Sequence, residues 1–345
     1  MEGIAKEMLG SCQEVYKRLG DEESKRIYFD RLMHSISGDY KYILDIFKDF
    51  HETKWLEEQL GKPGDKYIFG CGYYGNRIFT DTRNVAWKGY IDNNQSLWGG
   101  VKNNLPIYNP NDVPRDAVIF IGVIHYQSEI RHQLLELGFA EENIINYGKV
   151  IFDLVKKQYF DLPYLSHVED EVFVDAGVLN GFSSQEFVKW AGDKFLHIYC
   201  FEPDKKNFPK CESNLADLIA QQKLTIIPKG VWDKAERLSF SSSGDGASHV
   251  GEGDDYIDVV TLDEALAGKK VTFIKMDIEG SEKRALMGAR KIISEQHPKL
   301  AISIYHKYED IVELPELIMS YYPEYKFYLR HYDLNNCETV LYAIP

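Results

Sequence analysis

One pattern limits the folds that are open to this chain. A strand enters a glycine turn, a helix begins, and a second strand ends in an acidic residue. An apolar run ends in Asp175 and enters a turn with Gly177 and Gly181. Residues 183–186 (SSQE) then have the pattern of a capping box. A second apolar run ends in Glu202, 27 positions after Asp175. This order predicts a nucleotide-type βαβ unit whose second-strand acid holds two ribose hydroxyls.

The sign of the charge at this turn indicates the kind of ligand. In a dinucleotide site the first turn faces a pyrophosphate, which a carboxylate at Asp175 would repel. A cofactor with a cationic ammonium and a cationic sulfonium would instead be attracted to Asp175. S-adenosylmethionine is such a molecule, so we expect a methyl-transfer site that uses it as cofactor.

Composition excludes several other classes. The chain has 345 residues, enough for two domains, with 40 basic and 54 acidic side chains and a net charge of −14. Because it has no long basic run, we expect no nucleic-acid partner. The five cysteines are scattered, so neither a disulfide framework nor a zinc site is predicted. Residues 1–7 do not resemble a signal peptide, and no apolar stretch reaches the roughly 20 residues of a membrane span, so we expect a cytoplasmic protein.

Periodicity divides the chain into four segments. Residues 1–60 have helical spacing of apolar residues, and 61–150 read as a small Rossmann-like α/β domain. Its strands are expected at 66–69, 87–92, 117–121 and 144–145, with a helix at 126–137. Residues 151–169 are expected to be a connector.

Residues 170–345 are expected to form a second α/β domain. Its strands are expected at 172–175, 198–202, 224–229, 237–241, 271–277, 300–305, 326–330 and 339–343, and its helices at 183–191, 206–221, 261–267, 281–294 and 308–321. This alternation predicts a doubly wound, mostly parallel sheet, with the last two strands as an antiparallel pair at one edge. The loop 242–253 is too glycine-rich for an element, and we expect it to be mobile.

The cofactor site is predicted at the carboxyl ends of these strands, where ligands of doubly wound sheets bind. We expect the glycines to allow close backbone approach and Asn180 or Ser183 to meet the carboxylate of the methionine moiety. Trp232 or a neighbour would pack on adenine, with Asp233 near the exocyclic amine. A lone glycine turn can also be purely structural. The candidate cofactor-binding residues are Asp175, Gly177, Asn180, Gly181, Phe182, Ser183, Glu202, Pro203, Asp204, Trp232, Asp233 and Asp277.

The candidate catalytic residues are Asp277, His306 and Glu279. Asp277 would orient the acceptor or help to remove its proton, and His306 would act as general base. Structural alternatives remain, since Asp277 could cap a helix near residue 281 and His306 could be a hydrogen-bonded surface residue. The three side chains could also hold a divalent ion, but such a dispersed set is a weak metal signal, so no metal is expected. His249 and His331 are expected to be ordinary polar residues.

The block from about residue 170 to 345 resembles the FkbM family of S-adenosylmethionine-dependent methyltransferases. The matching segments are FVDAG (173–177), FEPD (201–204) with NF (207–208), LDE (262–264), FIKMDIEGSE (273–282) and LMGA (286–289). The resemblance implies a class I methyltransferase fold and O-methylation of a sugar or another small metabolite. The family commonly has Gly-Ala-Asn-Ile-Gly where this chain has GVLNG (177–181), so the contact of Asn180 with the methionine moiety is in doubt.

The first α/β module has its own glycine motif. The sequence GCGYYG (70–75) follows a strand and precedes a helical stretch, and Asp92 ends the next strand. This has the form of a dinucleotide fingerprint, and it also resembles the small Rossmann-like domains attached to sugar-modifying enzymes. A degenerate module that positions a partner or acceptor and a working nucleotide site are both open.

Three functional hypotheses follow. The first is a methyltransferase that acts on a small-molecule or glycan acceptor. The second is a non-catalytic, two-module nucleotide-binding or scaffolding protein. The third is an enzyme with nicotinamide-linked redox chemistry at residues 70–75. Residues 1–60 could form a homodimerisation arm, a lid or simply core.

Overall fold

The computed structural model describes residues 2–82, 84–192, 194–244, 248–251 and 253–345. The chain forms two compact units. The large unit comprises residues 1–46, 157–332 and 336–345, and the small unit comprises 47–156 and 333–335. The predicted boundary at residue 60 is therefore corrected, because the first 46 residues belong to the large unit.

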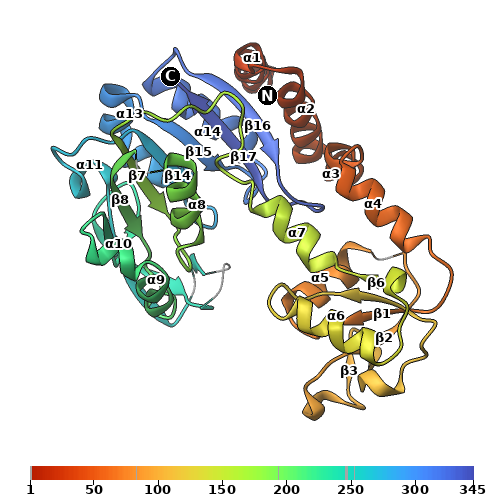
Figure 1. The fold of residues 1–345 in the computed structure, drawn as a ribbon. Helices are drawn as coiled ribbons and strands as arrows, with labels where there is room; N and C mark the ends of the chain where they lie inside the picture. The colour runs from red at the N-terminus through yellow and green to blue at the C-terminus, as the bar shows by residue number, and fades with distance from the viewer. Residues whose placement is uncertain (1, 83, 193, 245–247, 252) are drawn as a thin grey trace. The chain divides into compact units, whose positions relative to one another are not determined.

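The large unit is built on a seven-stranded sheet in the order β16-β17-β15-β14-β7-β8-β9 (Figure 1). The strands from β15 to β9 in this order are parallel, whereas β17 runs antiparallel to both β15 and β16. The doubly wound sheet with an antiparallel edge pair is thus confirmed. The strands are β7 (Glu171–Ala176), β8 (Phe195–Phe201), β9 (Leu224–Ile227), β14 (Phe273–Met276), β15 (Lys299–Ser303), β16 (Lys326–His331) and β17 (Thr339–Ile344).

Both faces of this sheet are buried, as expected for parallel strands. Phe173 on β7 stacks on Phe187 of α8, with ring centroids 4.3 Å apart, while Val174 and Ile274, of opposite parity, are fully buried. The predicted helices at 206–221 and 281–294 are each divided into two. The helices after β7 are α8 (Phe182–Ala191), α9 (Phe208–Asn214), α10 (Ala216–Ala220), α11 (Leu262–Ala265), α12 (Glu282–Met287), α13 (Arg290–Gln296) and α14 (Asp310–Tyr321).

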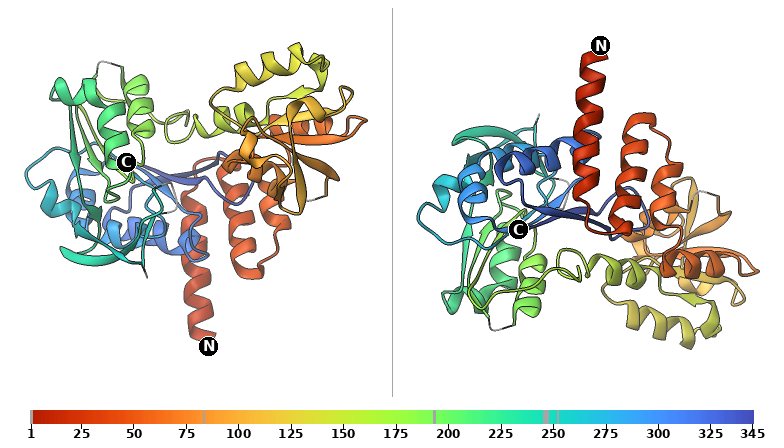
Figure 2. Two further views of the ribbon diagram at one scale, coloured as in Figure 1. Left: turned by 90° about the horizontal axis from the view of Figure 1, so that it is seen from below. Right: turned by 90° about the horizontal axis from the view of Figure 1, so that it is seen from above.

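The first helices pack against the edge of this sheet. The helices that do so are α1 (Glu2–Arg18) and α2 (Glu22–Ser37), and α3 (Lys41–Phe47) follows them in the chain. Leu19 forms a β-bridge with Phe327, and Ser24 Oγ accepts a hydrogen bond from the backbone N–H of Leu329 at 2.9 Å. Figure 2 shows these helices beside the C-terminal strands. Ile27 and Ile43 are fully buried. Ile36 of the same stripe is exposed, so the apolar stripe of this segment is core only in part.

A separate four-stranded sheet lies between β9 and β14 in sequence, in the order β10-β13-β11-β12. Its strands are β10 (Gly230–Val231), β11 (Glu236–Ser241), β12 (His249–Val250) and β13 (Asp255–Val260). Two predictions are corrected here: the strand expected at 237–241 lies outside the main sheet, and the loop 242–253 contains β12. β11 pairs with β12 and β13, so the glycine-rich segment is the connection of a hairpin. Residues 245–247 and 252 lie outside the described part of the chain, so its expected mobility stays a prediction.

The small unit has a six-stranded sheet in the order β3-β4-β2-β1-β5-β6, in which only β3 is antiparallel to its neighbour. Its strands are β1 (Lys66–Phe69), β2 (Trp87–Ile91), β3 (Val101–Lys102), β4 (Leu105–Tyr108), β5 (Val118–Ile121) and β6 (Ile144–Ile145). Its α-helices are α4 (His51–Leu60), α5 (Tyr73–Asp81), α6 (Gln127–Glu136) and α7 (Tyr147–Val155). Helix α7 occupies the start of the predicted connector, because Asn146 caps it and Ile151 and Leu154 are buried.

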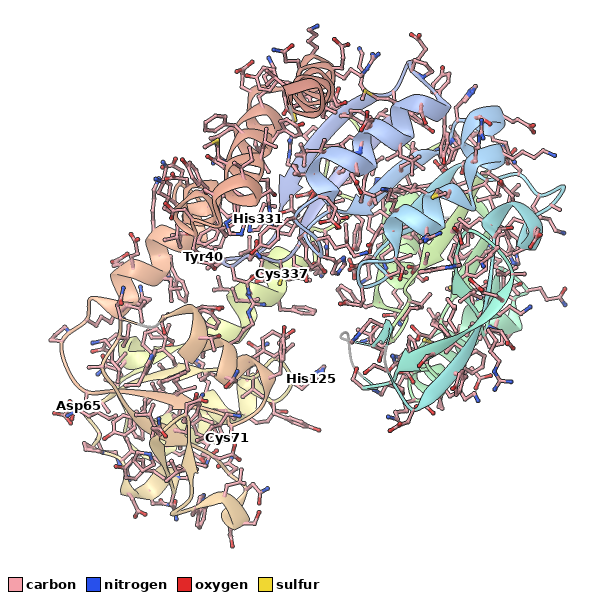
Figure 3. All side chains as sticks on the ribbon, turned by 180° about the vertical axis from the view of Figure 1, so that it is seen from behind. Tyr40, Asp65, Cys71, His125, His331 and Cys337 are labelled. Carbon is pink, nitrogen blue, oxygen red and sulfur yellow. The ribbon has the colours of Figure 1, made fainter. Side chains whose placement is uncertain are left out.

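The C-terminal ends of β1 and β5 meet at one edge of the small sheet, since the two strands are parallel neighbours. Cys71 and His125, labelled in Figure 3, follow these two strands. Across the described ranges of the chain, no helix is both long enough and apolar enough to cross a membrane.

Candidate active site

The carboxyl ends of four neighbouring strands of the large unit meet at one edge of the sheet. β7 ends at Asp175 and Ala176, Glu202 follows β8, Asp277 follows β14 and His306 lies three residues after β15. A cavity of about 620 Å³, including its open mouth, lies at this edge. It is lined by Gly177, Leu179, Phe201, Glu202, Pro203, Asn207, Gly230, Val231, Phe240, Ser248, His249, Val250, Ile257, Val259, Asp277, Ile278, Glu279 and Ser281.

Asp175 has a different setting from the one expected. Its carboxylate is fully buried and lies 3.2 Å from the ammonium of Lys275, which is also buried. Ser183 and Ser184 donate hydrogen bonds to Asp175 Oδ2 at 2.6 and 2.7 Å. Among the described residues that line the cavity, Asp175 does not occur. The expectation that Asp175 faces a cationic ligand with a free negative charge is therefore corrected, because Lys275 balances that charge inside the protein.

The glycine turn brings two backbone segments into close contact. Gly177 has a φ of +85°, and a Cβ at this position would lie 1.8 Å from the carbonyl oxygen of Asp277. Lys275 Nζ donates to the carbonyl oxygen of Gly177 at 2.7 Å. Gly181, at a φ of +88°, leaves no room beside Leu215. Only glycine fits at Gly177, which lets the turn approach both the cavity and the end of β14.

The start of α8 uses its polar atoms within the turn. Asn180 Oδ1 accepts a hydrogen bond from the backbone N–H of Phe182 at 3.1 Å, and the Ser183 hydroxyl is directed to Asp175. Neither Asn180, Phe182 nor Ser183 is among the described residues on the cavity wall. The side chains of Asn180 and Ser183 thus have a structural role, and their expected contact with a ligand stays a prediction.

Glu202 is the second-strand acid, and it lies on the cavity wall. Its Oε2 accepts from the backbone N–H of Leu179 and its Oε1 from that of Asp204, both at 2.8 Å. Burial raises the pKa of Glu202, although these two hydrogen bonds partly oppose it. Each oxygen keeps a lone pair for a further donor. Pro203, the next residue, also lines the cavity.

Asp204 holds the hairpin that covers the cavity. The hydroxyls of Ser242 and Ser248 donate to its carboxylate at 2.9 and 2.6 Å. Burial raises its pKa, but these and further hydrogen bonds outweigh burial and keep the pKa of Asp204 below its usual value. Asp204 does not line the cavity among the described residues; it holds in place the segment containing Ser248 and His249, which do.

His331, the other histidine set aside above, is buried with its Nδ1 2.8 Å from Thr339 Oγ1.

Trp232 and Asp233 do not occur among the described residues of the wall. Trp232 packs against the apolar cluster of the four-stranded sheet, and the Arg284 guanidinium lies 5.7 Å from the centre of its ring. Asp233 forms an ion pair with Arg284. The expected contacts of Trp232 and Asp233 with adenine therefore stay predictions, and the neighbours Gly230 and Val231 are the residues of this turn on the wall.

A cluster of acids surrounds His306 next to the cavity. Its Nε2 lies 3.5 Å from Asp277 Oδ1 and 3.6 Å from Glu279 Oε1, and its Nδ1 lies 3.1 Å from Glu282 Oε1. Tyr159 donates to Asp277 Oδ2 at 2.8 Å, and Tyr305 donates to Oδ1 at 3.2 Å. Burial opposes ionisation of Asp277, but Lys275 and His306 outweigh it and lower the pKa of this carboxyl.

His306 does not have the charge that a general base needs. Burial disfavours its protonated ring, but Glu279, Glu282 and Asp277 outweigh burial and raise the pKa of His306 to about 11. A ring that is protonated at neutral pH cannot accept another proton. His306 is also absent from the described cavity wall, whereas Asp277 and Glu279 are part of it. The predicted base role of His306 is therefore not supported by its surroundings.

Sequence reasoning missed several residues of this site. Lys275 had a visible signal, since it is a charged residue in the buried strand Phe273–Met276 and so requires a buried partner. Glu282, which is fully buried, followed Ser281 in a segment interpreted only as a helix start. Tyr159 and Tyr305 are distant in sequence from Asp277, and no local pattern indicated that they donate to it.

The sheet order, the glycine turn and the acids at the strand ends define a class I methyltransferase fold. Residues 175–330 match the family described as Methyltransferase FkbM domain, so the chain carries a methyltransferase domain of the FkbM family.

The chain is also similar to solved structures. A crystal structure of methyltransferase FkbM from Methylobacillus flagellatus KT is 21% identical, covers 92% of this chain and 99% of its own, and gives a TM-score of 0.53. Fibrillarin from Aeropyrum pernix, solved with natively bound S-adenosyl-L-methionine, is 11% identical over 56% of this chain and 74% of its own, with a TM-score of 0.36. No curated protein matches the chain.

Proposed function

We propose that the large unit binds S-adenosylmethionine in this cavity and transfers its methyl group to a hydroxyl of a sugar or another small metabolite. The observation that supports this most is the charge of the wall. Glu202, Asp277 and Glu279 line the cavity, and none of its described lining residues is a lysine or arginine. Such a wall attracts the cationic ammonium and sulfonium of the cofactor and disfavours a pyrophosphate.

The cofactor is proposed to lie along the carboxyl ends of the strands. Glu202 accepts hydrogen bonds from the two ribose hydroxyls, and the apolar side chains of Val231, Phe240 and Ile257 surround adenine. The glycine turn at Gly177 faces the methionine moiety.

The transfer itself needs orientation more than acid–base chemistry, because the sulfonium already activates the methyl group. The acceptor oxygen attacks the methyl carbon, the carbon–sulfur bond breaks, and its electron pair stays on sulfur. Asp277 orients the acceptor hydroxyl. The hydroxyl proton passes to the Glu279 carboxylate, which is on the wall and whose side chain is 32% exposed, so that it can return the proton to water.

Isothermal calorimetry with S-adenosylhomocysteine, the product of this reaction, tests the cofactor site. We expect one molecule bound per chain, and a folded sample that shows no binding heat would refute the proposal. Formation of S-adenosylhomocysteine from S-adenosylmethionine with hydroxyl acceptors then separates an enzyme from the non-catalytic scaffolding alternative, which would bind without turnover.

A further inference from the structure

The residues around His306 form a second feature of the site that methyl transfer alone does not explain. One carboxylate oxygen each from Asp277 and Glu282, and one ring nitrogen of His306, all lie within 4.8 Å of one another. Ligand atoms around a six-coordinate ion with bonds of about 2.1 Å are separated by roughly 3.0 Å when adjacent and 4.2 Å when opposite. Small side-chain movements would therefore bring all three donors onto one ion.

Buried atoms without hydrogen bonds point into this cluster. The Glu282 side chain is fully buried, and its Oε2 has no hydrogen-bond partner. The His306 side chain is 9% exposed, and neither ring nitrogen makes a hydrogen bond, although Nδ1 lies 3.1 Å from Glu282 Oε1. Buried polar atoms are nearly always hydrogen-bonded. The His306 ring nitrogens at least have the neighbouring carboxylates, but Glu282 Oε2 requires another partner, such as a ligand that is not part of the protein chain.

We propose that Asp277, Glu282 and His306 bind a divalent metal ion beside the cavity, which Asp277 also lines. One imidazole and two carboxylates form a mixed nitrogen and oxygen donor set, which suits a first-row divalent ion such as Mn²⁺. A bound ion takes the place of the proton that the surrounding carboxylates otherwise keep on His306, because a histidine ligand binds a metal in its neutral form. The three residues come from adjacent elements: Asp277 follows β14, His306 follows the neighbouring strand β15, and Glu282 begins α12.

The position of Asp277 connects this ion to the reaction. Asp277 is both a donor of the cluster and part of the cavity wall, so an ion held by it is open to the acceptor. The ion would coordinate the acceptor oxygen and make its hydroxyl more acidic, with the proton passing to Glu279 before the oxygen takes the methyl group from sulfur. This role, though not the binding itself, rests on the function proposed above.

Electron paramagnetic resonance of Mn²⁺ tests the binding directly. The full chain is treated with EDTA, desalted and titrated with MnCl₂, and the signal of free Mn²⁺ is followed. We expect one site per chain. Glu282→Gln, which keeps the oxygen that accepts from the Ile278 N–H, should weaken the site at least as much as loss of a supporting residue does, roughly ten- to a hundred-fold.

Glu313→Gln is the matched control, because Glu313 is a half-exposed carboxylate paired with Lys283 outside the cluster. It should leave Mn²⁺ affinity unchanged. No binding by the wild type at millimolar Mn²⁺, or equal affinity in Glu282→Gln and Glu313→Gln, would overturn the proposal.

If Glu282→Gln does not fold, pulsed electron paramagnetic resonance of the wild type tests the metal site instead. Electron spin-echo modulation of Mn²⁺ bound to the wild type should show coupling to the nitrogen of His306, and its absence would overturn the proposal. S-adenosylhomocysteine binding measured in EDTA keeps the two proposals apart. A chain that binds S-adenosylhomocysteine but not Mn²⁺ refutes only the metal site, and a chain that binds neither refutes both.

Discussion

The two glycine turns of this chain are held in nearly the same way, in two different units. In the small unit, Lys102 Nζ donates to the carbonyl oxygen of Cys71 at 2.6 Å, and the N–H of Cys71 donates to the second-strand acid Asp92 at 2.8 Å. In the large unit, Lys275 Nζ donates to the carbonyl oxygen of Gly177 at 2.7 Å. The N–H of Leu179 donates to the second-strand acid Glu202 at 2.8 Å.

The two turns differ in the buried residue that precedes them. The residue two places before the first glycine is Ile68 in the small unit and Asp175 in the large unit, and both are fully buried. Asp175 is paired with Lys275. The glycine spacing therefore reports how the backbone turns, whereas the buried charges distinguish the two turns chemically. The comparison leads to three predictions, two of which concern the proposed ligand.

Removing the buried cation should have the largest effect. Lys275→Met leaves the fully buried Asp175 carboxylate without its partner, and breaking such a pair costs about 3–5 kcal/mol. We expect the free energy of unfolding of the large unit to fall by this amount in urea denaturation followed by circular dichroism.

The matched change in the other turn is Ile68→Val, which removes one buried methylene and should cost only about 0.5–1.5 kcal/mol. The double variant Asp175→Asn with Lys275→Met should regain part of the stability lost by Lys275→Met alone. A loss below about 1 kcal/mol for Lys275→Met would show that the pair is not what distinguishes this turn.

Substitutions of the two second-strand acids, Glu202 and Asp92, compare the two turns in ligand binding. Glu202→Gln removes the charge that is proposed to accept the ribose hydroxyls, and hydrogen bonds to a charged group contribute about 1.5–3 kcal/mol. We expect S-adenosylhomocysteine affinity, measured by calorimetry, to fall about ten- to a hundred-fold. Asp92→Asn, the equivalent change in the small unit, should leave it unchanged. Equal weakening by the two variants would mean that the turns do not differ in the way argued here.

Much of this comparison was predictable from local patterns, because strand ends and glycine turns are encoded by neighbouring residues. The strand that precedes Asp277 and the acid Glu202 were both placed at the site from apolar runs alone. The same patterns could not show that Lys275 neutralises Asp175, since that pair forms only when β14 aligns with β7 in the sheet. The surroundings of Trp232 could not be predicted for a related reason: its turn leads into the separate four-stranded sheet, where its ring packs.

The charge of His306 also could not be predicted from its neighbours in the sequence. A histidine at a strand end suggests a base, but its pKa depends on three carboxylates brought close by the turn after β14 and the start of α12. The N-terminal helices show the opposite case. Their apolar stripe was visible, but its partner, the edge strand β16, begins about 300 residues later.

The smallest effect that we expect is a pH dependence of S-adenosylhomocysteine binding, caused by Glu202, the second-strand acid of the large unit. Burial raises the pKa of Glu202 above its ordinary value of 4.5, so this carboxyl gains its proton at a higher pH than an exposed glutamate does. Above its pKa it is ionised and accepts the ribose hydroxyls; as the pH falls through that pKa, the charge and the affinity are lost. We expect S-adenosylhomocysteine to bind several-fold more weakly at about pH 5 than at about pH 7.5, at constant ionic strength. Glu202→Gln should lack this part of the slope, because glutamine has no proton to gain. Identical slopes in the wild type and Glu202→Gln would assign the titration to another group and remove Glu202 from the proposed ribose contact.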